Sequence, residues 1–523
     1  MPRALSFSRY GPDLDCSAVV KNGKTPAANA RTRLAILAVF AFNAVYFPEV
    51  FPPANSPNEL SRIEAIVAFV DHGTFAIDVP LKKYGDHEDK SVYGGHSYSN
   101  KAPGLVFAGI AVYGALRIFA PQPDNPWAPL FVLTRLLTVS LVSLLALTRL
   151  TRRLAREPFR DAGGVITLAV ALGTPFLFYG RSFFSHAWTG SLLFLAWDAV
   201  VSAEESGKPA GARMVWAGFL AGFALISEYT VALVVLLLGL RVLSGGRFPA
   251  VARFCLGVLP PLALLLVYNF VCFGSPWSLS SAHEAAPQYA EAARHGLFGI
   301  GPPSVRVMLA FLFDPSRGLL LFSPFWLWAV PGFVSWWRSG RERRDCVFAA
   351  VAVASSVIVL SGYPEWGGGF CLGSRYLVPL TFFAALGIPF ALKSRPSRWL
   401  FAAAVSFSVA QLFLLASSWP YIAWNVVWPV ANVAWWTIVR DWVAPNLGLY
   451  LGMPPVWSLV VPGLATAGAL WLGVRSLFGK RSIVRTAAAV GMGILALVLL
   501  IAIAPPLPDG GHWRDWLINF LEG

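Results

Sequence analysis

The chain contains apolar blocks that are almost free of charge and nearly as long as a bilayer is thick. Each block approaches or reaches the ~20 residues that an α-helix needs to cross the hydrocarbon core. Lipid offers no hydrogen-bond partner to a backbone, so segments of this kind cross as helices. The sequence therefore predicts an all-α, polytopic transmembrane helix bundle, with blocks at Leu34–Phe51, Leu130–Leu147, Gly163–Tyr179, Cys255–Val271, Val347–Leu360, Leu400–Ala416, Val456–Leu472 and Val484–Ala504.

The composition agrees with this class. Of the 523 residues, 56% are hydrophobic and only 13% are charged, whereas a soluble domain has roughly 25% charged residues. The five cysteines form no CxxC pair, which indicates packing residues rather than a metal site or a disulfide framework.

The net charge of +14 would suit a nucleic-acid partner, but its distribution argues against one. The basic residues form short clusters between the apolar blocks, which is where the positive-inside rule places cytoplasmic loops. We therefore expect them to set the topology, and we expect no nucleic-acid partner. The clusters are Arg149–Arg160, Arg241–Arg253, Arg338–Arg344, Lys393–Arg398 and Lys480–Arg485.

These clusters thread the chain through the plasma (inner) membrane about 13 times. The prediction is a cytoplasmic N-terminal tail (1–33), a transmembrane domain (34–510) and an external C-terminal tail (511–523). Segments 52–103, 273–318 and 417–455 are then external loops. Gly104–Ala120 is taken as a helix lying at or dipping into the outer surface, because a full crossing would leave the Arg149–Arg160 cluster outside.

The first external loop concentrates the polar chemistry of the chain. Between Glu49 and Lys101 lie eight of the 27 acids and three of the seven histidines. Such a concentration favours catalysis or ligand binding, and the alternative is a loop that is polar only because it is solvated.

A helix is predicted to open this loop at Ser56-Pro57-Asn58-Glu59 and to end at His72-Gly73. Ser56 is expected to cap it, Pro57 to occupy the first turn, and Glu59 to hold the capping-box position. The apolar stripe of this helix is expected to lie on the bilayer. Glu59 has two interpretations, a cap alone or a carboxylate held at the membrane surface beside Arg62.

A second polar cluster runs from His87 to Lys101, just before Pro103-Gly104. A lysine there can pair with a phosphate at headgroup depth. The alternative is ordinary snorkelling of Lys101 to the lipid headgroups.

The order of these features resembles the GT-C membrane glycosyltransferases. Most similar is the family 39-like branch that contains protein O-mannosyltransferases and the aminoarabinose transferase of lipid A. The matching motifs cover the first 200 residues and are Asn58-Glu59, Arg62, Lys101-Ala102-Pro103, Arg135-Leu136 and Arg181–His186. Beyond them the resemblance is architectural, apart from an outer-face loop from Tyr363 to Tyr376.

The resemblance implies transfer of a sugar from a polyprenyl-phosphate donor to a hydroxyl or amine of a cell-envelope glycan, lipid or protein. A carboxylate would take the acceptor proton, with inversion, and cations would stabilise the leaving phosphate. The candidate bases are Glu59, Asp78 and Asp89. The candidates for binding the donor phosphate or the substrate are Asn58, Arg62, Lys101, Arg135, Arg375 and Tyr376.

One departure bears on this assignment. The family usually carries an acidic pair whose Asp is the proposed base, and this chain has Asn58-Glu59 in its place. Either Glu59 serves, or Asp78 or Asp89 does, or the acceptor needs little deprotonation, or the protein is a GT-C-like chain without catalysis. No cofactor is expected, and although a divalent metal serves some GT-C enzymes, no ligand spacing here requires one.

The rival class is a multi-pass transporter or lipid flippase. The number of crossings would suit it, but no repeated halves and no pair of broken helices in corresponding positions are evident.

Overall fold

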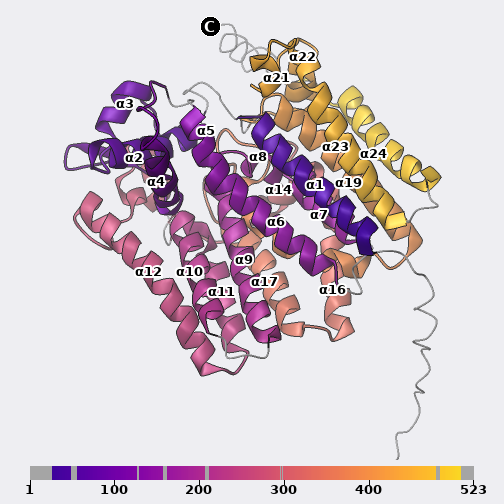
Figure 1. Ribbon diagram of the computed structural model, residues 1–523, viewed down its shortest axis with the longest axis horizontal. Helices are drawn as coiled ribbons and strands as arrows, with labels where there is room; N and C mark the ends of the chain where they lie inside the picture. The colour runs from indigo at the N-terminus through magenta and orange to yellow at the C-terminus, as the bar shows by residue number, and fades with distance from the viewer. Residues whose placement is uncertain are drawn as a thin grey trace, which may run out of the picture.

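The computed structural model describes residues 26–48, 56–125, 129–156, 162–206, 211–294, 296, 299–423, 425–478 and 483–507. The predicted tail 511–523 and most of the predicted tail 1–33 lie outside these ranges. The described part is a helical bundle with one small two-stranded sheet (Figure 1). The predicted all-α fold class is confirmed.

The bundle helices are α1 (Pro26–Tyr46), α5 (Pro129–Arg135), η2 (Leu136–Ser140), α6 (Leu141–Leu154), α7 (Gly163–Leu172), α8 (Phe176–Tyr179), α9 (Ser185–Glu205), α10 (Ala212–Ser227), η3 (Tyr229–Val231), α11 (Ala232–Leu243), α12 (Phe248–Phe273), α15 (Leu319–Phe322), η5 (Pro324–Trp328), α16 (Ala329–Ser339), α17 (Arg343–Leu360), η6 (Arg375–Leu380), α18 (Thr381–Gly387), η7 (Ile388–Ala391), α19 (Arg395–Ser417), α23 (Val460–Phe478) and α24 (Ile483–Ile503). The connecting segments carry α2 (Pro57–His72), α3 (Asp78–Tyr84), β1 (Lys90–Tyr93), β2 (His96–Ser99), α4 (Gly104–Arg117), η4 (Ser280–His283), α13 (Pro287–Arg294), α14 (Val305–Phe313), η8 (Val430–Trp435), α20 (Trp436–Ile438), α21 (Leu447–Tyr450) and α22 (Pro455–Ser458).

Five helical stretches in the described ranges are long and apolar enough to cross a membrane. They are Pro129–Leu154, Phe248–Phe273, Arg395–Ser417, Pro455–Phe478 and Ile483–Ile503. The first four each contain one predicted apolar block, and the fifth contains the block Val484–Ala504 except for its last residue. The remaining apolar helices are shorter or more polar, so the number of about 13 crossings stays a prediction. Helix α4 has 14 residues and extends about 21 Å, less than the ~30 Å hydrocarbon core.

Two predictions from local patterns are corrected. The block Gly163–Tyr179 is not one helix, because α7 ends at Gly173 and Pro175 starts the separate short helix α8. The apolar side of α2 does not lie on the bilayer, since Leu60, Ile63 and Val67 are buried inside the protein. Helix α2 packs against α4. The contact is so close that a Cβ on Gly109 of α4 would lie 2.3 Å from the Cδ1 of Ile66 on α2. The predicted end of α2 is confirmed, with Gly73 in the left-handed conformation.

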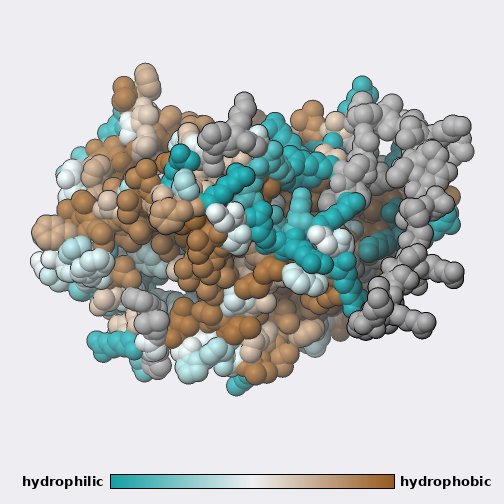
Figure 2. Space-filling model, turned by 90° about the horizontal axis from the view of Figure 1, so that it is seen from below, coloured by the Kyte–Doolittle hydropathy of each residue, from teal (hydrophilic) through white to brown (hydrophobic). Residues whose placement is uncertain are grey.

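One end of the bundle gathers three of the basic clusters. Arg149 and Arg153 of α6 form ion pairs with Asp198 of α9. Arg241 of α11 lies between Glu204 of α9 and Asp345 of α17, at 2.9 Å from each. Figure 2 looks at the molecule from below Figure 1 and shows hydrophilic residues gathered among apolar ones. Arg344 also pairs with Glu204, at 3.4 Å, so the loops that carry these three clusters share one end.

The loops predicted to be external are tied to one another instead. The Ser91 hydroxyl donates to the carbonyl of Ser280 at 2.8 Å, and the N–H of Gly301 donates to the carbonyl of Gly362 at 2.8 Å. Arg317 donates to the carbonyls of Gly369 and Ile422, at 2.6 and 2.8 Å. Segments from four parts of the chain are thus joined by hydrogen bonds.

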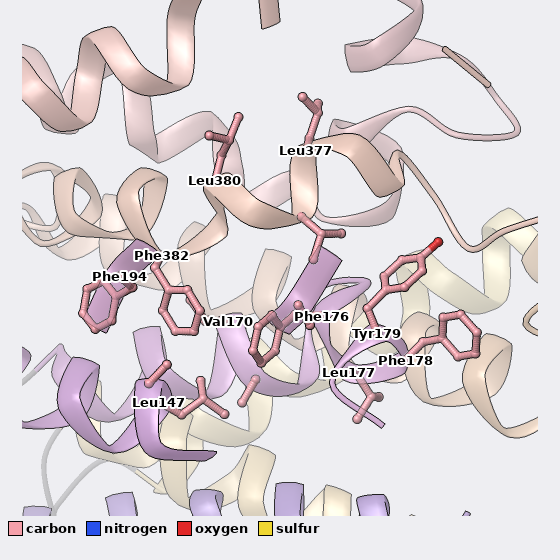
Figure 3. Close-up of a cluster of buried hydrophobic side chains, with 14 of the residues drawn as sticks. Leu147, Val170, Phe176, Leu177, Phe178, Tyr179, Phe194, Leu377, Leu380 and Phe382 are labelled. Atoms are coloured by element: carbon pink, nitrogen blue, oxygen red, sulfur yellow. The ribbon is translucent and has the colours of Figure 1, made fainter. Parts of the chain in front are cut away.

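An aromatic core joins α8, α9 and α18 (Figure 3). Phe382 of α18 stacks on Phe194 of α9, with ring centroids 4.8 Å apart, and meets Phe176 of α8 edge-on at 5.2 Å. Tyr179, next to this core, exchanges hydrogen bonds of 3.1 Å with the carbonyl and the N–H of Leu372. The core therefore fixes the segment that leads into Arg375.

Candidate functional site

The loops predicted to be external enclose a cavity of about 480 Å³. The first loop contributes Asn58, Asp89 and Lys101, the segment after α12 contributes Glu284 and Tyr289, and the segment before α18 contributes Arg375 and Tyr376. The cavity thus collects polar and aromatic groups from parts of the chain as far apart as Asn58 and Tyr376.

Lys101 and Asp89 form an ion pair in the cavity wall. The Lys101 Nζ lies 2.9 Å from the Asp89 Oδ1, and both side chains are only 16% exposed. Burial raises the pKa of Asp89, but Lys101, Arg375 and His87 together outweigh burial, and the net pKa lies below the ordinary value. Burial also lowers the pKa of Lys101, while Asp89 opposes that change. An ammonium has three donors, so this pair leaves Lys101 capacity for a further anion.

Arg375 is a second cation in the same wall. Its Nη2 donates to the Tyr376 hydroxyl at 2.9 Å, and its guanidinium lies over the Tyr376 ring. In the described ranges no carboxylate lies within ion-pair distance of Arg375, and its buried Nε has no hydrogen-bond partner. A planar guanidinium with unused donors suits a phosphate.

Gly368 makes room for this arginine. Its φ is +73°, in the left-handed region that favours glycine, and a Cβ there would lie 2.8 Å from the Arg375 Nε. The neighbouring Gly369 has a similar φ of +65°, but a Cβ there would meet nothing within 4 Å. Only Gly368 therefore has a steric link to the cation.

Glu284 is a cavity carboxylate that sequence reasoning missed. Its Oε2 accepts a hydrogen bond of 2.7 Å from the Asn100 amide. Burial raises the pKa of Glu284 to about 7, against the opposing effects of Lys101 and Asn100. No local pattern around Glu284 distinguishes it from other loop acids, and only its contact with the first loop does.

Glu59 does not line the cavity. It is 4% exposed, and its carboxylate accepts hydrogen bonds from the N–H of Phe183 and the hydroxyls of Tyr421 and Ser56. Ser56 makes no side-chain bond to the N–H groups of α2, so the predicted capping box is not formed. The Glu59 carboxylate instead ties the first loop to two distant segments.

Three further predicted residues also lie outside the cavity lining. Asp78 accepts bonds from the N–H of Ser97 at 2.9 Å and from His96 at 2.8 Å, at the surface. Arg135 donates to the carbonyls of Ala44 and Phe47 at the end of α1, as a basic residue often does at a helix C-terminus.

Arg62 is the third predicted residue outside the cavity lining, and it bonds to Asn58, which does line the cavity. Its Nη1 donates to the carbonyl of Asn58 at 2.7 Å and to the Asn58 side chain, and its Nη2 donates to the Ser185 hydroxyl at 3.1 Å. Ser185 in turn donates to Glu228 at 2.6 Å. Arg62 therefore orients Asn58 rather than facing the cavity itself.

His87 and Glu64 anchor the acidic segment of the first loop. The His87 Nε2 lies 2.7 Å from the Glu64 Oε2, and both side chains are almost fully buried. Burial raises the pKa of Glu64, and the bond to His87 opposes that rise. This buried pair fixes the backbone two residues before Asp89.

The described residues contain no group of three or more His, Cys, Asp or Glu placed to hold a metal ion. The expectation that no cofactor is required stays a prediction.

No protein-family model and no curated protein sequence matches the chain. Among solved structures, the chain matches ArnT from Cupriavidus metallidurans in the apo state, at 16% identity and a TM-score of 0.51, over 91% of this chain and 76% of that one. The same protein bound to undecaprenyl phosphate matches at 16% identity and a TM-score of 0.52, over 91% and 77%. The apo oligosaccharyltransferase of Archaeoglobus fulgidus matches at 11% identity and a TM-score of 0.42, over 92% and 59%, and this last likeness carries no weight here.

The chain therefore shares the fold of a GT-C membrane glycosyltransferase, and the predicted resemblance is confirmed at the level of the fold.

Proposed function

We propose that this chain is a membrane glycosyltransferase that moves a sugar from a polyprenyl-phosphate donor to a hydroxyl or amine, with inversion at the anomeric carbon. One observation carries the proposal. Lys101 and Arg375, which come from loops 274 residues apart, line one cavity, in a fold shared with a protein solved with undecaprenyl phosphate.

The two cations suit the leaving group of this reaction. As the anomeric carbon–oxygen bond breaks, its electron pair stays on the phosphate, whose negative charge grows. Preorganised cations in a site poor in water stabilise such a charge most strongly. Lys101 is held in place by Asp89, and Arg375 by Tyr376, so neither has to be reorganised when the charge develops.

The neighbouring side chains suit a sugar. Tyr289, Tyr363 and Phe184 line the cavity between the polar groups, and Tyr363 packs edge-on against Tyr376 with centroids 5.3 Å apart. A mixture of aromatic walls and a few polar groups is the usual lining of a small-molecule site.

Of the three carboxylates predicted as bases, Asp89 lines the cavity, but its charge is paired with Lys101. Glu59 and Asp78 do not line the cavity, so each would need an acceptor that approaches by another route. The departure at Asn58 is consistent with a base placed elsewhere in the cavity.

We further propose that the cavity opens on the external face of the plasma membrane, with a cytoplasmic N-terminus, an external C-terminus and an acceptor in the cell envelope. The gathering of three arginine clusters at a separate end supports this orientation, because such clusters favour the cytoplasmic side.

The test is a transfer assay with purified full-length protein in lipid nanodiscs. Radiolabelled undecaprenyl-phosphate pentoses and hexoses are supplied singly, and release of undecaprenyl phosphate by transfer or hydrolysis is measured. We expect turnover of at least one donor and its loss in Lys101→Met. A parent protein that neither binds undecaprenyl phosphate nor cleaves any donor would overturn the proposal, and movement of uncleaved lipid across vesicles would favour a flippase.

A further inference from the structure

The loop that follows α12 brings a carboxylate to the cavity, and several bonds hold it there. Ser91 of β1 pairs with Glu284 in an isolated antiparallel bridge, and the N–H of Ala285 donates to the carbonyl of Lys90 at 3.0 Å. The Ser280 hydroxyl donates to the carbonyl of Asn100 at 3.0 Å. The backbone on both sides of Glu284 is therefore attached to the first loop.

The side chain of Glu284 is oriented as well. The Asn100 amide donates to its Oε2 at 2.7 Å, and Asn100 directly precedes Lys101, which lines the same cavity. A carboxylate accepts through two oxygens, and Asn100 holds one of them, while the Oε1 accepts no hydrogen bond from the residues that the structure describes. Glu284 is not ion-paired within the described residues, unlike Asp89.

We infer that Glu284 is the general base of the transfer reaction and that Asn100 is the residue that positions it. This inference rests on the proposed function and names the base that it leaves open. The Glu284 carboxylate takes the proton of the acceptor hydroxyl or amine while the acceptor atom bonds to the anomeric carbon. The bond from that carbon to the phosphate oxygen breaks, its electron pair stays on the phosphate, and Lys101 and Arg375 stabilise the resulting negative charge.

The electrostatic surroundings suit this role. Burial raises the pKa of Glu284 to about 7, the nearby Asp89 adds to the rise, and Lys101 and the Asn100 amide oppose it. His283, the adjacent titratable residue, bonds to Ser278 instead, at 2.7 Å. A base with a pKa near the working pH is the most effective one, whereas the lowered pKa of Asp89 makes it a weaker base.

The experiment compares Glu284→Gln, Glu284→Asp and Asn100→Ala with the parent and with Glu291→Gln. Glu291 lies on α13 in the same loop, is exposed, and is outside the cavity lining. Undecaprenyl phosphate binding, thermal stability and the pH dependence of turnover are measured for each protein in nanodiscs.

We expect the parent rate to rise with pH through about 7 and then level off. Glu284→Gln should lower the turnover ~10²-fold or more. It should also abolish the rise of the rate below about pH 7, which is the acid limb of the profile. Its affinity for undecaprenyl phosphate should stay within about threefold of the parental affinity. Glu284→Asp should recover part of the rate. Asn100→Ala should move the acid limb to higher pH, because the Asn100 bond lowers the pKa of Glu284.

A parent that turns over while Glu284→Gln stays within about threefold of its rate overturns the inference but leaves the proposed function standing. An acid limb that Asn100→Ala does not move also overturns it, and this arm decides the question if Glu284→Gln does not fold. A parent that neither binds undecaprenyl phosphate nor cleaves a donor removes the proposed function, and the inference with it.

Discussion

Tyr421 donates a hydrogen bond to Glu59 across 362 residues of sequence. Both side chains are buried, at 1% and 4% exposure, and the other carboxylate oxygen of Glu59 accepts the N–H of Phe183. The carboxylate therefore joins the helix that opens the first loop, the turn before α9 and the segment after α19. From this position we expect Glu59 to serve the assembly of the site.

From this contact we predict that Glu59→Gln acts mainly on stability. The amide keeps one acceptor oxygen but loses the charge, and weakened bonds to buried groups cost about 1–3 kcal/mol. Tyr421→Phe should reproduce part of the loss. Thermal unfolding and donor turnover, measured on both variants, separate the alternatives, since a catalytic base at Glu59 would instead give an intact fold with a rate ~10²-fold lower.

Neutralising the cavity cations should weaken phosphate binding. We expect Lys101→Met and Arg375→Met each to reduce affinity for undecaprenyl phosphate by about tenfold or more, because a lost charged hydrogen bond costs ~1.5–3 kcal/mol. Lys83→Met is the control, since Lys83 pairs with Asp124 at the surface. If Lys101→Met and Arg375→Met bound undecaprenyl phosphate as tightly as Lys83→Met, Lys101 and Arg375 would have structural roles only.

The two adjacent glycines give a matched steric test. Both Gly368 and Gly369 have positive φ, so alanine strains the backbone at either position. Only at Gly368 does the new Cβ meet Arg375. We expect Gly368→Ala to approach Arg375→Met in its loss of undecaprenyl phosphate affinity, while Gly369→Ala keeps the parental affinity at a similar thermal stability. The same affinity in both glycine variants would contradict the steric link.

Glu284 should also make stability depend on pH. Its folded pKa of about 7 lies above the ordinary value of 4.5, so between these values the folded state binds more protons than the unfolded one. Stability from this group is therefore present below about pH 4.5 and is lost as the pH rises to about 7. The glutamine in Glu284→Gln cannot titrate. The melting temperature of this variant should therefore rise relative to that of the parent as the pH increases from about 5 to about 8. A constant difference would show that burial does not raise this pKa.

Cysteine labelling tests the orientation. A membrane-impermeant maleimide applied to intact cells should label Glu88→Cys, Gln288→Cys and Pro364→Cys more than the parent, whose own Cys255 is exposed. It should not label Arg156→Cys, Arg341→Cys or Arg395→Cys until the cells are opened. All six positions are exposed in the fold, so a reversed pattern would place the cavity on the cytoplasmic side.

The sequence by itself determined the class of the protein and much of its helical layout. Long apolar blocks are a local property, because lipid forces each one to satisfy its own backbone. Five of these blocks accordingly lie in helices long enough to cross. Breaks were harder to predict, as at Gly173 and Pro175, since glycine and proline occur inside many membrane helices.

Part of the site could also be predicted. Asp89 and Lys101 belong to the polar cluster of the first loop, Asn58 became a candidate through the resemblance, and all three line the cavity. The order of the motifs in that loop pointed to the GT-C fold, which the structure shares.

Only the tertiary structure separated residues of the same type. Glu59, Asp78 and Asp89 are acids of one loop, yet one is buried in a tie to Tyr421, one lies at the surface beside His96, and one lines the cavity. Glu284 entered the site through its bond to Asn100, 184 residues away. Burial and long-range pairing decide whether a carboxylate is structural or reactive, because both set the free-energy cost of its charge. The residues next to it in the sequence determine neither of them.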